Sequence, residues 1–335
     1  METVLIAPDG ALARFPFAAL PGREPDTFLI EDMALATVPA PQLLGELLSA
    51  AKQPSNETSS PQLLMVGNVD FGKASPENTK PTSLLATRGG SLSSFAPLPG
   101  TATEIEAIQK VYQSQFKNPP TVLAAASATK GALQAQLANA RWIHLATHGF
   151  FAPAERQSAN SERADPLALD QEISSVAGWN PGLLSGIVLA GANQSGGEGG
   201  ILTAAEVAAL DLTQTELVVL SACETGLGRL AGGEGALGIQ RAFHAAGVRT
   251  VLGSLWKVDD TATQILMTEF YRNHWEKKMS PLAALRAAQL ALLNSTLDTS
   301  KLRGLTVEEP QTAQRATSAR LSPRLWAAFV LSGSP

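Results

Sequence analysis

The spacing of apolar and polar residues changes along the chain. In the first fifty residues, short apolar stretches at 4–7, 11–17 and 28–38 are separated by the turn signals Asp9-Gly10 and Pro21-Gly22. Short apolar stretches between such turns are typical of small antiparallel strands. The sequence therefore predicts a small N-terminal β-rich element.

Continuous apolar runs alternate with amphipathic stretches from residue 62 to the C-terminus. The runs predict strands buried on both faces at 62–68, 121–124, 141–148, 184–190, 216–222 and 249–252. Helical spacing predicts helices from 103 to the prolines at 119 and 120, and at 127–137, 235–246, 261–275 and 281–294. Strands that alternate with helices favour an α/β fold, with a mostly parallel sheet and helices on both faces.

A polar tract rich in Ser, Asn and Pro divides the chain after the N-terminal element. We predict three parts: the N-terminal β-rich part at 1–50, a linker at 51–61 and the core at 62–335. The last apolar run, 325–331, predicts a strand at the edge of the sheet. Such an edge could pair with a second copy in a homodimer, or be covered by its own chain.

Composition and charge exclude several function classes. Of 335 residues, 44% are apolar and 16% charged, an ordinary globular composition. Lys and Arg number 25 against 30 Asp and Glu, and no basic run could neutralise a row of phosphates, so we expect neither nucleic-acid nor membrane-surface binding. Glu2 and Pro8 do not fit a signal peptide, and no apolar stretch is long enough to cross a bilayer. We expect a cytoplasmic protein.

Cys223 is the only cysteine of the chain, which excludes intramolecular disulfides and cysteine-based zinc sites. A lone cysteine is more often a small buried apolar residue than a nucleophile. Cys223 and His148, however, each close a predicted strand, and the carboxyl ends of parallel strands meet at one edge of a sheet. A thiol and an imidazole together there can carry out nucleophilic acyl transfer. The amides of Gly149 and Cys223 would form the oxyanion hole.

Two other patterns point to different chemistry and are weaker. The glycines at 226 and 228 with Ala231 fit a dinucleotide fingerprint, but no acidic residue lies between Glu234 and Asp259 to bind a ribose. His144 and His148 have the spacing of a helical zinc motif, but they lie in a predicted strand and no Glu separates them. We expect His144 to be a packed residue behind the site, and no metal or other cofactor.

Several ordered motifs resemble the CHAT domain, a family of caspase-like cysteine peptidases often attached to tetratricopeptide repeats in bacteria. The motifs are WIHLATHGFF at 142–151, NPGLLSGIVLAGAN at 180–193, ILTAAEVAALDL at 201–212, LVVLSACETGLG at 217–228, GEGALGIQRAFHAAGVRTVLGSLWKVDDTAT at 233–263 and WAAFVLSGSP at 326–335. The first forty residues also resemble the start of that domain. The resemblance therefore covers nearly the whole chain.

The resemblance implies a caspase-like three-layer sandwich and a thiol protease, hence a hydrolase, with His148 as acid and base and Cys223 as nucleophile. It also implies that the segment from Ser254 to Trp256 lines the cleft and pairs with an extended protein or peptide substrate. No tetratricopeptide repeat precedes the domain here, so this module is absent or was removed. A tetratricopeptide-repeat module or another regulatory partner is expected to control activity.

Specificity and turnover leave alternatives open. Asp259 and Asp260 follow Trp256, and we hypothesise that Asp260 lies at the floor of the first pocket and selects Arg or Lys before the scissile bond. The alternative is that Asp260 caps the following helix. The favoured function is a cysteine endopeptidase that cleaves one or a few partner proteins through a thioester. A catalytically idle domain that binds peptides or assembles a complex is the alternative, and transfer of the acyl group to an amine is a third outcome.

Overall fold

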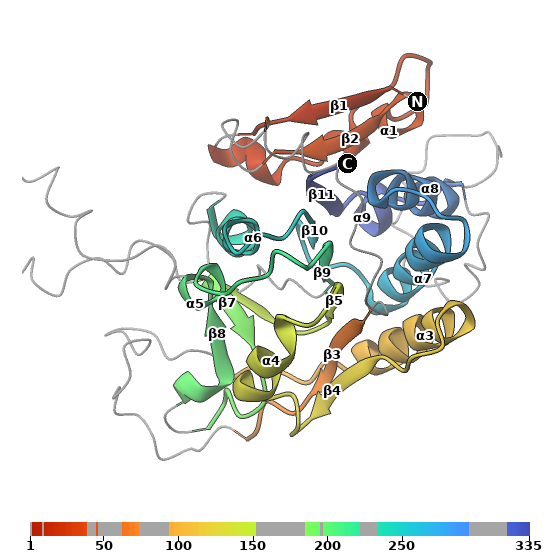
Figure 1. The fold of residues 1–335 in the computed structure, drawn as a ribbon. Helices are drawn as coiled ribbons and strands as arrows, with labels where there is room; N and C mark the ends of the chain where they lie inside the picture. Colours follow the sequence, from red (N-terminus) through yellow and green to blue (C-terminus); the bar gives the residue numbers. More distant parts are fainter. Residues whose placement is uncertain are drawn as a thin grey trace, which may run out of the picture.

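An eight-stranded sheet forms the middle layer of the computed structural model (Figure 1). The structure describes residues 2–8, 10–38, 45, 62–73, 94–151, 185–194, 197–221, 234–294 and 320–335. In sheet order the strands are β1 (Thr3–Ile6), β2 (Ala34–Thr37), β11 (Phe329–Gly333), β10 (Thr250–Ser254), β9 (Leu217–Leu220), β5 (Trp142–Leu145), β3 (Leu63–Val69) and β4 (Thr121–Ala125). Neighbouring strands pair in parallel except for β10 and β11, which are antiparallel.

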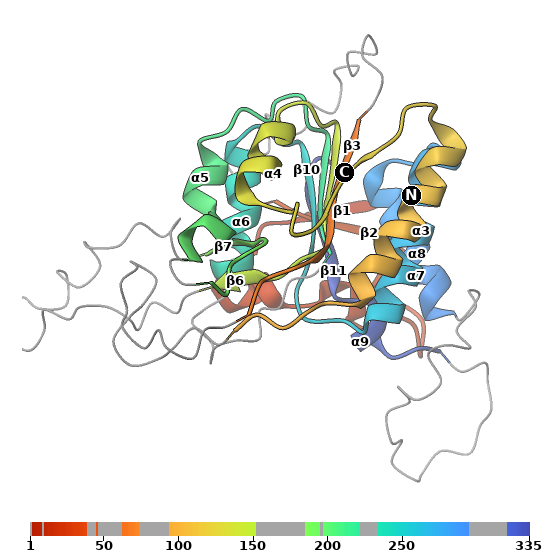
Figure 2. The same ribbon diagram turned by 90° about the horizontal axis from the view of Figure 1, so that it is seen from below.

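Helices cover both faces of this sheet, as Figure 2 shows. One face carries α3 (Gly100–Gln115), α7 (Asp260–Tyr271), α8 (Pro281–Leu293) and α9 (Pro323–Trp326), and the other carries α4 (Lys130–Leu137), α5 (Ala204–Ala208) and α6 (Glu234–Ala245). A π-helical turn, Arg272–Glu276, extends α7. This arrangement confirms the predicted α/β fold, a three-layer sandwich in which a mostly parallel sheet lies between two layers of helices.

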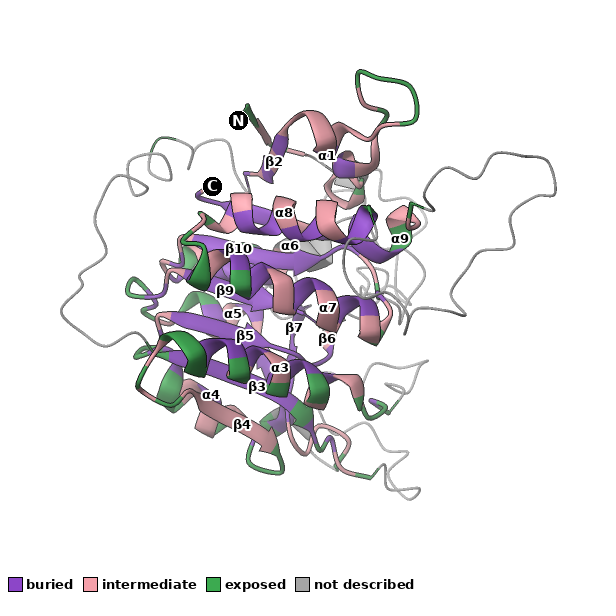
Figure 3. Ribbon diagram, turned by 90° about the vertical axis from the view of Figure 1, so that its right-hand side faces the viewer, coloured by how far each residue is buried: buried purple, intermediate pink, exposed green. Residues whose placement is uncertain are grey.

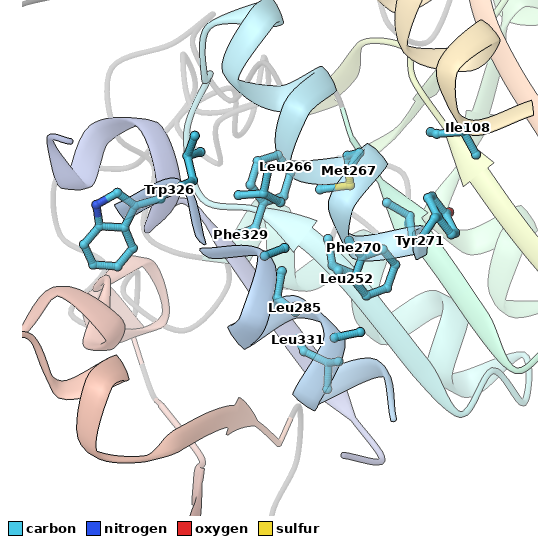
Figure 4. Packing of buried hydrophobic residues seen from close by; sticks show 14 of the residues in the cluster. Ile108, Leu252, Leu266, Met267, Phe270, Tyr271, Leu285, Trp326, Phe329 and Leu331 are labelled. Atoms are coloured by element: carbon cyan, nitrogen blue, oxygen red, sulfur yellow. The ribbon is translucent and has the colours of Figure 1, made fainter. Parts of the chain in front are cut away.

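Burial follows the apolar pattern of the sequence. The central strands β5 and β9 are buried at every residue, as expected of strands covered on both faces. Helices α3, α7 and α8 turn their buried sides to the sheet and their less buried sides outward (Figure 3). Under α7 and α8, large apolar side chains interdigitate, among them Leu266, Phe270, Leu285, Phe329 and Leu331 (Figure 4). This packing holds α7 and α8 against the sheet.

The N-terminal residues depart from the predicted antiparallel strands. β1 and β2 pair in parallel, and β2 joins β11, so both strands extend the main sheet. Residues predicted as a strand at 11–17 belong mostly to a 3-10 helix, Gly10–Arg14, and those at 28–38 split into α1 (Leu29–Asp32) and β2. The carboxylate of Glu31 accepts a hydrogen bond from the Phe28 amide at 2.7 Å, which favours a helical turn there.

Two further strands lie elsewhere than expected. The predicted strand at 325–331 becomes α9 followed by β11, and β11 lies between β10 and β2. It is therefore an inner strand, and a homodimer formed through it as a free edge is ruled out. The predicted strand at 184–190 forms β7 (Ser185–Val188) in a separate antiparallel sheet with β6 (Gly149–Phe151) and β8 (Ile201–Thr203). The predicted linker at 51–61 lies outside the described residues.

Candidate active site

The pairing of β5 with β9 has the same offset in residue number as the two predicted catalytic positions. Trp142 is opposite Leu217 and Leu145 is opposite Leu220, a constant offset of 75 residues (217 minus 142). The offset between His148 and Cys223 is also 75 (223 minus 148), so each is the third residue after the last paired residue of its strand. Cys223 itself lies outside the described residues.

The described chain of β9 continues to Ser221, two residues before Cys223. The Ser221 amide donates to the Leu145 carbonyl at 3.0 Å, so the ladder between the two strands extends beyond β9. Two residues span at most about 7 Å of chain. Ser221 therefore marks the region that Cys223 can reach.

His148 is held in an enclosed position, with 2% of its surface exposed. Its Nε2 lies 2.7 Å from the carbonyl oxygen of Ala96, which can only accept, so Nε2 is the donor. The ring packs against both Phe71 and Phe95, whose ring centroids lie 5.0 and 5.6 Å from that of His148. In the neutral imidazole this leaves Nδ1 as the basic nitrogen.

A small pocket opens beside His148 at this end of the sheet. His148, Ser221, Trp256 and Asp260 all line it. The pocket thus brings together the end of β5, the end of β9, the segment after β10 and the start of α7. The sequence prediction that these segments share one edge is consistent with this placement.

A buried polar network lies against the same pocket. The carboxylate of Glu104, which is 3% exposed, accepts a hydrogen bond from the Ser221 hydroxyl and lies 3.1 Å from His144 Nε2. His144 is fully buried, as a packed residue should be, and its Nδ1 is 3.1 Å from the Tyr271 hydroxyl. Burial, and secondarily the charge of Glu104, raise the pKa of Tyr271 well above its ordinary value.

Sequence reasoning did not identify Glu104. The residue lies on α3 among Thr101, Ile105 and Ile108, all of which are buried. A carboxylate on the apolar face of an amphipathic helix is the signal that could have identified it, because buried charges are rare unless they are paired.

The two aspartates after Trp256 have different roles. The Asp259 carboxylate accepts from the amides of Thr261 and Ala262 at 2.9 and 3.1 Å, so Asp259 is the N-cap of α7 and does not line the pocket. The alternative that Asp260 is the cap is therefore wrong by one residue. Asp260 lines the pocket beside Gly100, where a Cβ would clash with its carboxylate.

The remaining predicted site residues surround this pocket at different depths. Trp256 lines it, and the Trp256 indole donates to the Arg324 carbonyl at 3.0 Å. Ser254 is buried at the end of β10, and its hydroxyl donates to the Trp256 carbonyl, so it supports the segment from behind. Gly149 begins β6 next to His148 and is opposite Ile187. Its predicted oxyanion partner, the Cys223 amide, lies outside the described residues.

Among the residues that the structure describes, no group of three or more His, Cys, Asp or Glu side chains could hold a metal ion. Within that same part of the chain, every helix is too short or too polar to cross a bilayer.

The chain matches the family model of the CHAT domain over residues 1–334. It belongs to the CHAT domain family. The family resemblance stated from the motifs is thereby confirmed over nearly the full chain.

Two curated relatives of this CHAT domain carry the name tetratricopeptide repeat protein 28. The mouse protein is 24% identical over 348 residues, covering 97% of this chain, and the human protein is 24% identical over 343 residues, covering 99%. The chain spans 12% of the length of each relative.

Two solved structures are similar to this CHAT domain at 8% identity. One is the Arg-specific cysteine proteinase gingipain R, with a TM-score of 0.48 over 95% of this chain and 57% of that chain. The other is a complex of the pro- and mature domains of RgpB from Porphyromonas gingivalis, with a TM-score of 0.46 over 90% of this chain and 55% of that chain.

Proposed function

We propose that this CHAT domain is a cysteine endopeptidase of the caspase type, with Cys223 and His148 as its catalytic dyad. The observation that carries the proposal is the register of β5 and β9. In the sequence, positions 148 and 223 each come three residues after the last pair of that register, Leu145 and Leu220. Adjacent strands lie about 4.8 Å apart, so equivalent positions just beyond them stay within reach of one substrate carbonyl. Membership of the CHAT family supports the same assignment.

In the proposed reaction, the Cys223 thiolate attacks the peptide carbonyl to form a thioester, and the His148 ring gives a proton to the leaving amine. The amides of Gly149 and Cys223 stabilise the oxyanion. Water then attacks the thioester and gives a proton to the His148 ring, the carbon–sulfur bond breaks, and the Cys223 sulfur leaves as the thiolate, which restores the starting dyad. The hydrogen bond from His148 Nε2 to Ala96 assigns the proton transfers to Nδ1. The residues supply every proton transfer, so no cofactor is required.

We further propose that Asp260 favours a basic side chain before the scissile bond. Its carboxylate is exposed and lines the pocket that His148 also lines. Because Asp259 provides the cap of α7, helix capping does not account for Asp260. Lys257 lines the same pocket and carries the opposite charge, so we expect a preference for Arg or Lys rather than strict selection.

A second candidate function is an idle domain that binds peptides or assembles a complex. The observation that favours it is the near-complete enclosure of His148. Under the proposed peptidase function, the same enclosure suits an enzyme whose site is opened by a partner. The names of the curated relatives support a tetratricopeptide-repeat module as that partner. We propose that the domain and this partner are cytoplasmic.

Labelling by peptide acyloxymethyl ketones tests this proposal. A panel with Arg, Lys, Asp or Leu next to the reactive group is incubated with the chain, and the adduct is mapped by mass spectrometry. We expect an adduct on Cys223 with the Arg and Lys probes. Turnover of matching reporter peptides should be lost in Cys223→Ala and His148→Ala while the fold is retained. Labelled Cys223 without turnover, or no adduct at all, would favour the idle domain.

A further inference from the structure

One side chain outside the proposed dyad, Asn193, connects the two segments that enclose His148. The first segment, at Phe71 and Gly72, follows β3, and the second, at Phe95, precedes α3. Asn193 itself follows β7 and belongs to neither segment. Each segment contributes one of the aromatic rings that pack against the imidazole of His148.

Asn193 binds the backbone of both segments. Its Oδ1 accepts from the Phe95 amide at 2.8 Å, and its Nδ2 donates to the carbonyls of Phe95 and Gly72, each at 2.9 Å. Its own amide donates to the Phe71 carbonyl at 2.8 Å. The side chain thus bonds both backbone groups of Phe95, in the way a neighbouring strand would.

These bonds matter because neither segment lies in a helix or strand. Backbone groups inside a sheet are positioned by the ladder, whereas those of an irregular segment depend on side chains or water. Phe95 directly precedes Ala96, whose carbonyl accepts from His148 Nε2 at 2.7 Å. Fixing Phe95 at both of its backbone groups therefore fixes the acceptor that orients the imidazole.

We propose that Asn193 is a positioning residue of the active site, which holds His148 through Phe95 and Ala96. This inference rests on the proposed peptidase function. Asn193 does not touch the reacting atoms. It sets the position of the Ala96 carbonyl, and that carbonyl keeps the proton on Nε2 and leaves Nδ1 to exchange protons with the substrate. An orienting bond of this kind determines both the tautomer and the direction of a catalytic histidine.

Only an amide supplies both kinds of bond at this position. Asn193→Asp is nearly isosteric, but it removes the two N–H donors and turns a carboxylate oxygen toward two carbonyl oxygens. Asn193→Ala removes the bonds without adding repulsion, and it serves if the Asp variant fails to fold. The matched control is Asn273→Asp, because Asn273 is a second asparagine whose amide donates to a backbone carbonyl, that of Ala284, away from the pocket.

The test measures kcat and KM on a reporter peptide together with the NMR signals of the His148 ring. We expect Asn193→Asp and Asn193→Ala to lower kcat about tenfold or more, because small displacements of catalytic groups are costly, while KM changes less than about threefold. The signal of the Nε2 proton should broaden through exchange with water. Asn273→Asp should keep kcat within about twofold of the wild type, even if its melting temperature falls by as much as that of the Asn193 variants.

The outcomes separate this inference from the proposed function. If the wild type cleaves no peptide and Cys223 takes no label, the peptidase proposal fails, and with it a catalytic role for Asn193. If the wild type is active and both Asn193 variants retain kcat within about twofold, with an unchanged Nε2 signal, only the positioning role is refuted.

Discussion

Glu104→Ala is expected to destabilise the fold strongly, although it replaces a charged residue in a helix with the best helix former. The carboxylate is 3% exposed and the His144 ring beside it is fully buried. Removing the carboxylate leaves the Ser221 hydroxyl and His144 Nε2 without their acceptor. Each buried polar group left unpaired costs about 1–3 kcal/mol.

The expected loss in the free energy of unfolding is about 2–6 kcal/mol, the sum for the two buried polar groups that lose their acceptor. This is a large share of the roughly 5–15 kcal/mol that stabilises a folded protein. Glu104→Gln keeps one oxygen acceptor, so it should lose less stability than Glu104→Ala, about 1–3 kcal/mol. The matched control is Glu106, a second glutamate of α3, which is exposed. Glu106→Ala should change the free energy of unfolding by less than about 0.5 kcal/mol.

Urea unfolding followed by tryptophan fluorescence measures these differences, with melting temperatures as a second probe. A double-mutant cycle with His144→Ala should show a coupling energy of at least about 1 kcal/mol, since the two residues share a contact. The reasoning is refuted if Glu104→Ala is no less stable than Glu106→Ala, because the network would then contribute nothing to the folded state.

Two further predictions follow from single groups. Burial lowers the pKa of both His244 and His274 below the ordinary value of 6.5, so the unfolded chain binds more protons than the folded one, and stability should fall as the pH drops below about 6.5. The fall in melting temperature between about pH 7 and pH 5 should be smaller in His244→Gln, and an equal fall would contradict the role of that ring. Asp259→Ala should cost about 1 kcal/mol through loss of the α7 cap and leave the peptide preference unchanged, whereas Asp260→Ala should weaken the preference for Arg and Lys with little loss of stability. Unchanged preference in Asp260→Ala would reject the pocket role.

The sequence predicted local structure well where a single physical cause decides it. Continuous apolar runs located β5 and β9, because strands covered on both faces must be apolar at every position. The direction of β1 and β2 and the inner position of β11 depend on pairing between residues far apart in the chain, and no local pattern carries that information. The alternative that Asp260 caps α7 missed the true cap, Asp259, by one residue at a helix start, where boundaries predicted from a pattern are least certain.

The candidate dyad could be proposed from the sequence for a related reason. His148 and Cys223 could be proposed as neighbours because each follows a buried strand, but the sequence alone could not align the strands. The structure shows an offset of 75 residues at all four pairs of β5 and β9. Glu104 and Asn193 were not found in this way, because each acts through contacts between elements distant in sequence.

The register of β5 and β9 connects the core to the proposed chemistry. Side chains alternate between the two faces of a strand, so a slip of one residue would turn every buried side chain of β9 to the opposite face. Val218 packs in one apolar cluster and Val219 in the other, so such a slip would exchange the two faces of the core. The packing that opposes the slip also keeps the ends of β5 and β9, at Leu145 and Leu220, level with each other. The proposed dyad follows these two ends in the sequence at equal offsets. Substitutions in the core of β9 should therefore lower peptidase activity at temperatures where the domain is still folded.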